Sequence, residues 1–152
     1  MDYFQSIVTE YLRAKRCVFV NTEYLVNLDA GDKQYKGRHW YCDVLAVNFE
    51  ESTLYLCEVT YSSTMQGLIS RLKAWDTHWQ LLAPALIRDA CVPDHWSVQP
   101  WIFIPKEQHR SFDEKFALNG TMPTPRVTHL EEILPWKYPS WDRKGDAVAE
   151  GA

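Results

Sequence analysis

The sequence has none of the short motifs that mark the common nucleotide-binding, hydrolase and histidine-based metal sites. It contains no GxGxxG and no GxxxxGK[ST], which excludes nucleotide-binding folds that depend on those phosphate loops. No GxSxG elbow occurs, so a Ser-His-Asp hydrolase is unsupported. The five histidines form no HxH or HxxxH pair, and a histidine-based metal site therefore has little support.

Cysteine is sparse, and no two cysteines have the CxxC spacing of zinc or redox sites. Three of the four lie in apolar, strand-like runs, which favours buried reduced thiols over disulfides. The cysteines are Cys17, Cys42, Cys57 and Cys91.

The sequence also lacks a long apolar run and an excess of basic residues. The first sixteen residues have neither the basic nor the apolar region of a signal peptide, so we expect a cytoplasmic protein without a membrane span. The net charge is −4, and any surface that binds phosphate groups must therefore be local. Two basic clusters are candidates for such a surface, unless they are simply solvated: Arg13, Lys15 and Arg16, and Lys33, Lys36 and Arg38.

The hydrophobic spacing predicts one mixed α/β domain over residues 1–137, followed by a disordered tail over 138–152. Serine or threonine at 62–64 is expected to cap the long helix, and Pro84 to kink or end it. In chain order we expect a helix over 3–16, strands over 17–29, 43–47 and 54–59, a long helix over 64–89, a strand over 98–104, a short helix over 107–118 and a possible short strand over 126–129.

Two carboxylates interrupt the apolar strands of a predicted β-hairpin, Asp43 in the first strand and Glu58 in the second. If the turn is centred between Glu50 and Glu51, the residue numbers of each cross-strand pair add up to 101. Asp43 and Glu58 then form such a pair and lie opposite each other on one face of the hairpin. Two half-buried carboxylates need a shared proton, a basic side chain or a cation between them.

The predicted order is α-β-β-β-α-β, which gives a mixed four-stranded central sheet flanked by helices on both faces. This order, with Glu10 on the first helix, Asp43 on the second strand, Glu58-Val59-Thr60 on the third and Gln66 opening the next helix, resembles the PD-(D/E)XK nuclease superfamily and its restriction-endonuclease-like fold.

The resemblance implies a metal-dependent nuclease that hydrolyses phosphodiesters, with DNA favoured over RNA. By position, Asp43, Glu58 and the Val59 carbonyl would hold Mg²⁺ or Mn²⁺, while Glu10 and Gln66 would assist. Such nucleases often pair, so a homodimer is a further expectation.

The departure from the family pattern is Thr60, which stands where the family has lysine and carries no charge. Lys73 or Arg71 on the long helix could replace that lysine, as could Lys36 or Arg38 before the second strand.

Two alternatives remain open. The chain can be a catalytically degenerate member that binds nucleic acid or a protein, or an unrelated interaction protein whose carboxylates form ion pairs. In the second case Asp43 pairs with Arg38 or Lys36, while Glu10 and Lys73 are ordinary surface residues.

Overall fold

The computed structural model describes residues 2–28 and 39–139. Its strands are β1 (Val18–Asn27), β2 (His39–Asn48), β3 (Thr53–Val59), β4 (Ser97–Ile104) and β5 (Arg126–His129). Its α-helices are α1 (Tyr3–Arg13), α2 (Gln66–Thr77), α3 (Trp79–Ala90) and α4 (His109–Lys115), and single 3-10 turns cover Lys106–Gln108, Leu130–Glu132 and Pro135–Lys137. Every helix within the described ranges is too short or too polar for a membrane-spanning segment.

The strands form one mixed sheet in the order β1-β2-β3-β4-β5. The first three strands are an antiparallel meander, and β4 and β5 continue the sheet in parallel. The expected mixed α/β architecture is present, but the expected number of four strands is wrong. The short strand expected over 126–129 is confirmed as β5, and the sheet has five strands because this segment pairs along the edge of β4.

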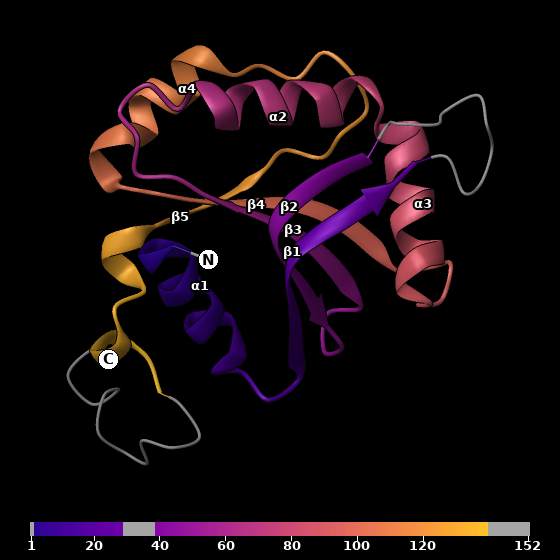
Figure 1. Cartoon of the computed structure of the whole chain (residues 1–152), viewed down its shortest axis with the longest axis horizontal. Coiled ribbons are helices and arrows are strands. Elements are labelled where there is room, and N and C mark those ends of the chain that lie inside the picture. Colours follow the sequence, from indigo (N-terminus) through magenta and orange to yellow (C-terminus); the bar gives the residue numbers. More distant parts are fainter. Residues whose placement is uncertain (1, 29–38, 140–152) are drawn as a thin grey trace.

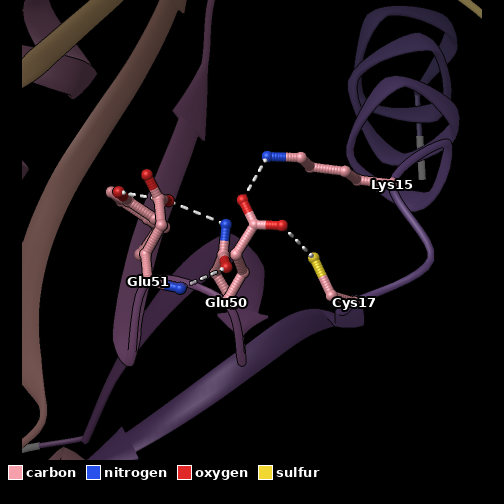
Figure 2. Close-up of polar contacts among 6 residues, drawn as sticks. Lys15, Cys17, Glu50 and Glu51 are labelled. Carbon is pink, nitrogen blue, oxygen red and sulfur yellow. Dashed lines mark hydrogen bonds and ion pairs between the residues drawn. The ribbon is translucent and has the colours of Figure 1, made fainter.

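The β2–β3 turn fixes the hairpin register through local polar contacts. The Asn48 amide donates to the Glu51 carboxylate and accepts from the Glu51 backbone N–H, at 2.7 and 2.9 Å. On the outer side of the turn, Lys15 donates to Glu50 at 3.1 Å and so ties the turn to the segment after α1 (Figure 2). Five consecutive pairs, from Val44 with Cys57 to Asn48 with Thr53, have residue numbers that sum to 101, which confirms the predicted register.

Helices cover both faces of the sheet, as predicted. Figure 1 shows α2 and α4 on one side and α1 on the other. On the first side, Leu54 and Leu56 pack in one apolar cluster with residues of α2, α3 and α4. On the opposite side, Val44 and Cys57 pack with Val8 and Leu12 of α1. The alternation of β3 between two apolar faces therefore makes the sheet the central layer of a three-layer structure.

The single long helix predicted over 64–89 is wrong, and so is the alternative that this helix ends at Pro84. It is divided at His78, whose backbone has φ −111° and ψ 20°, so α2 and α3 run in different directions (Figure 1). Pro84 neither ends nor begins a helix and lies inside α3. The residue before α2 is Met65 in the left-handed region with φ 51°, and the hydroxyls of Ser62 and Thr64 contact each other at 3.1 Å instead of capping the helix.

All four cysteines are free, and the burial expected for those in apolar runs is confirmed for Cys42 and Cys57 but wrong for Cys17. Cys42 and Cys57 are buried, Cys17 is partly exposed and Cys91 is exposed. The tail expected from residue 138 begins with a packed side chain, because the Tyr138 ring lies 5.2 Å from that of Tyr11. The rest of that prediction, over 140–152, lies outside the described residues.

Candidate functional site

Asp43 and Glu58 meet where β2 and β3 stop pairing through their backbones. The Asp43 backbone N–H donates to Glu58 Oε2 at 2.7 Å, and the Val59 backbone N–H donates to Asp43 Oδ2 at 2.9 Å. The last backbone pair before this point is Val44 with Cys57. Each carboxylate thus takes a donor from the other strand, and this exchange holds the two acids together at the open end of the hairpin.

The strands are irregular at this level of the sheet. In a regular strand, residues two apart share a face. Val44 packs on the α1 side, whereas Cys42 packs on the side of α2 and α3. Strand β1 also changes the face on which its side chains pack: Val20 packs on the α1 side, and Tyr24 on the side of α2 and α3. Between them lies Glu23, whose backbone has φ 53°. Asp43 therefore lies where two adjacent strands reverse their faces, a distortion typical of positions that aim a particular side chain.

The electrostatics of the pair are dominated by burial. Glu58 is 4% exposed. Burial, together with the negative charge of Asp43, raises the pKa of Glu58 to about 8. Burial also raises the pKa of Asp43, although the hydrogen bond from Val59 acts in the opposite direction. The site therefore favours a positive charge or a proton between the two acids.

Arg71, on α2, supplies one such charge. Its Nη1 donates to Glu58 Oε1 at 2.7 Å, and its side chain is 40% exposed. Water around the guanidinium weakens its field, and the pKa of Glu58 remains raised in spite of the ion pair. A guanidinium has five N–H donors, so Arg71 can donate to a ligand while it holds Glu58.

The carboxylates open into a pocket of about 260 Å³. Its polar lining includes the side chains of Thr60, Ser62, Thr64 and Gln66, and its far wall is the first turn of α2. No side chain among the described residues caps that helix. The first helical backbone hydrogen bond is donated by the Ile69 N–H to the carbonyl of Met65, the residue before α2. The first N–H groups of α2 therefore have no helical partner, and the residues that carry them line a pocket that also contains Arg71, an arrangement suited to a phosphate group.

The predicted site residues divide into two groups. Asp43, Glu58, Val59, Thr60 and Gln66 all line this pocket. The structure does not bring Glu10 and Lys73 to it: Glu10 is exposed and paired with Arg13 at 3.2 Å, and Lys73 is exposed on α2. Lys36 and Arg38 lie outside the described residues.

Two residues that contact the acids were not assigned to the site from the sequence. Gln5 of α1 contacts Asp43 through a hydrogen bond from its Nε2 to the Asp43 backbone carbonyl at 3.1 Å. The helical period gave a signal for this, because Gln5 lies on the same buried stripe as Val8 and Leu12. Arg71, weighed from the sequence beside Lys73, lies next to Leu72 and between Leu68 and Trp75, so it is a charged residue on an apolar stripe.

The pocket fits a hard divalent cation by the chemistry of its donors. Mg²⁺ and Mn²⁺ prefer oxygen ligands, and Mg²⁺ is commonly held by one or two carboxylates plus waters and substrate phosphates. Hydrogen bonds among the described residues engage both oxygens of Glu58 and Oδ2 of Asp43. Within residues 2–28 and 39–139, no group of three or more histidine, cysteine or carboxylate side chains is arranged to hold a metal.

Comparisons with protein-family models, with curated proteins and with solved structures find no match to this chain.

Proposed function

We propose that the chain is a divalent-metal-dependent phosphodiester hydrolase of the PD-(D/E)XK type, with DNA as the favoured substrate. The observation that supports this most directly is the convergence of Asp43 and Glu58 in one pocket, through reciprocal hydrogen bonds at 2.7 and 2.9 Å. Two acids close together, with Glu58 buried and Asp43 partly buried, are costly unless a cation joins them, and such pairs are concentrated at functional sites.

In this proposal the two carboxylates, with the Val59 carbonyl, hold Mg²⁺ or Mn²⁺. The bound metal would polarise a phosphoryl oxygen and lower the pKa of a bound water. Gln5 contributes by fixing the backbone of Asp43, and Gln66 lies at the entrance to α2. The family resemblance supports the same assignment, since the helix, the three-stranded meander and the acids on its second and third strands follow the family order.

Arg71 supplies the positive charge that the family's lysine, replaced here by Thr60, would otherwise provide. Its charge lies against Glu58, and its remaining N–H donors can stabilise negative charge on a phosphoryl oxygen. Because a guanidinium does not release its proton at neutral pH, Arg71 cannot serve as a general base. Thr60 is neutral, and its hydroxyl accepts from the Ser62 N–H at 3.1 Å. The start of α2 provides further donors for a phosphate.

Calorimetric titration with Mn²⁺ and Mg²⁺ tests the metal site. Wild type should bind metal at millimolar concentrations or below, and the double variant Asp43→Asn/Glu58→Gln should not bind. Glu10→Gln is the matched control, because it neutralises an exposed carboxylate outside the pocket and should bind like wild type. Circular dichroism checks that each variant is folded. Metal binding that persists in the double variant would exclude this pocket as the site.

Hydrolysis is then measured on plasmid, single-stranded and branched DNA and on RNA, with Mn²⁺ or Mg²⁺ present. Cleavage should disappear in Asp43→Asn and in Glu58→Gln while both remain folded. Arg71→Gln should lower the rate about 100-fold, the size of effect seen when one donor to a transition-state oxyanion is removed. Cleavage at the wild-type rate in both acid variants would rule out the hydrolase.

A second candidate function is a binding module that keeps this fold without catalysis. The observation that favours it is the ion pair itself, because Arg71 already compensates Glu58 at 2.7 Å while Thr60 adds no charge. On this alternative, Mn²⁺ and Mg²⁺ do not bind at millimolar concentration, and Arg71→Gln lowers stability without exposing a metal site. The calorimetry above separates the two functions.

A further inference from the structure

Exposed aromatic side chains flank the carboxylate pocket. Tyr61, 62% exposed, lies in the chain between Thr60 and Ser62, which both line the pocket. Tyr41, 55% exposed, lines an adjoining hollow of about 370 Å³ that shares Gly67 and Arg71 with the pocket. The carboxylate pocket and this hollow are therefore neighbours, and together they are called the groove below; Tyr41 lines the groove, and Tyr61 lies beside it.

The aromatic group at Tyr61 is held in place by α1. The Phe4 ring lies 4.5 Å from the Tyr61 ring at an angle of 34°, and the Tyr3 ring, 73% exposed, meets Phe4 edge-on at 5.4 Å. The same turn of α1 contacts the site through Gln5, which donates to the Asp43 carbonyl. Tyr61 is thus supported by Phe4 and still exposes most of its surface, as a stacking platform requires.

Among the described residues that line the groove, Arg71 is the one basic side chain, and it is engaged with Glu58. Lys115 donates to the backbone carbonyl of Thr64, a lining residue, at 3.3 Å. The whole chain carries −4. Double-stranded DNA is held mainly through many phosphate contacts, which such a surface provides poorly. Unpaired bases gain affinity by stacking on aromatic rings, and that gain needs little net positive charge.

We propose that this groove selects unpaired nucleic-acid strands, with bases stacked on Tyr61 and Tyr41 and a backbone phosphate near the start of α2. The inference rests on the proposed phosphodiester chemistry for its choice of ligand. It adds the class of substrate, a single strand or a frayed end, and the residues that recognise it.

Fluorescence anisotropy of the full chain in EDTA, where metal-dependent cleavage is prevented, tests the proposal. The probes are labelled oligothymidylate and oligouridylate of about 15 nucleotides and a hairpin duplex of about the same length. Either single strand should bind more tightly than the duplex. Tyr61→Ala should weaken single-strand binding about 5- to 100-fold, and Tyr61→Trp should restore it. Phe19→Ala, 62% exposed on β1 beside Phe49 and away from the groove, should bind like wild type.

The outcomes separate this inference from the proposed hydrolase. Single-strand binding that depends on Tyr61, without cleavage in Mn²⁺, upholds the inference and rejects the hydrolase. Duplex cleavage at the wild-type rate in Tyr61→Ala upholds the hydrolase and overturns the inference. Duplex binding as tight as single-strand binding, unchanged affinity in Tyr61→Ala, or no binding of either single strand also overturns it.

Discussion

Replacing Glu58 with glutamine should change how the stability of the protein depends on pH. The pKa of this carboxyl is about 8 in the folded protein, against 4.5 for an unperturbed glutamate, because it is buried beside Asp43. Between these two values the folded protein retains a proton that the unfolded chain has released. The free energy of unfolding must therefore fall as pH rises through this window.

The size of the effect follows from the two pKa values. Integrating the difference in bound protons from about pH 5 to pH 9 gives a loss of about 4 kcal/mol in the wild type. This is a large share of the roughly 5–15 kcal/mol that a domain of this size has in total. Glutamine has nearly the same shape and cannot ionise. Its amide can accept from the Asp43 N–H but then turns a donor toward Arg71, which costs about 1 kcal/mol.

Urea unfolding in EDTA at several pH values from about 5 to 9 measures this dependence. The seven tryptophans provide the fluorescence signal. Glu58→Gln should be within about 1 kcal/mol of wild type at the lowest pH and about 3 kcal/mol more stable at the highest. Glu10→Gln, an exposed carboxylate, should follow wild type throughout. A wild-type stability that rises over this range, or a slope that Glu58→Gln leaves unchanged, refutes the reasoning that burial beside Asp43 retains a proton on Glu58.

Further predictions concern the loop beside α2 and the cation in the site. Burial alone would raise the pKa of Asp76, but backbone N–H donors from Asn119, Gly120 and Met122 lower that pKa below its value in the unfolded chain. The ionised Asp76 therefore contributes to folding stability above the unfolded pKa, and this contribution is lost as the pH falls through the folded pKa. Asp76→Ala should cost about 2–4 kcal/mol in urea unfolding at neutral pH, and a loss below 0.5 kcal/mol would contradict these bonds. Gly120→Ala places a Cβ 2.5 Å from the Asp76 carbonyl oxygen and should cost more than about 1 kcal/mol, whereas Gly67→Ala, with open space around it, should be neutral or stabilising by up to about 1 kcal/mol. In calorimetry, Arg71→Gln should tighten Mn²⁺ binding about tenfold because it removes a competing charge, and weaker binding would show that the guanidinium supports the metal site.

Much of the hairpin could be predicted because its determinants are local. Asn48 and Glu51 close the turn through bonds between residues three apart, and the apolar alternation of β3 fixes which side chains share a face. With the register set, Asp43 and Glu58 had to lie on neighbouring strands at the same level. The expectation of helices on both faces followed from the same strands, whose two sides are both apolar.

The partners of these acids depended on how separate helices pack. Glu10 was the sequence candidate on α1, yet the helix buries the stripe that contains Gln5, Val8 and Leu12, and Glu10 points to solvent. On the other side of the sheet, Arg71 reaches Glu58 while Lys73, two residues later, is exposed. Two residues along a helix differ by about 200° in direction, so a small rotation decides which side chain enters the site.

By itself, then, the sequence determined a mixed α/β chain whose central hairpin brings two acids together, because turn chemistry and strand alternation act over a few residues. The tertiary structure decided what surrounds them. The left-handed backbone at Met65 and the break at His78 set the position of α2, and with it the approach of Arg71 and the uncapped N–H groups that line the pocket. Such placements arise from packing between segments far apart in the chain, and the local sequence pattern of a helix does not determine how the helix is rotated against a sheet.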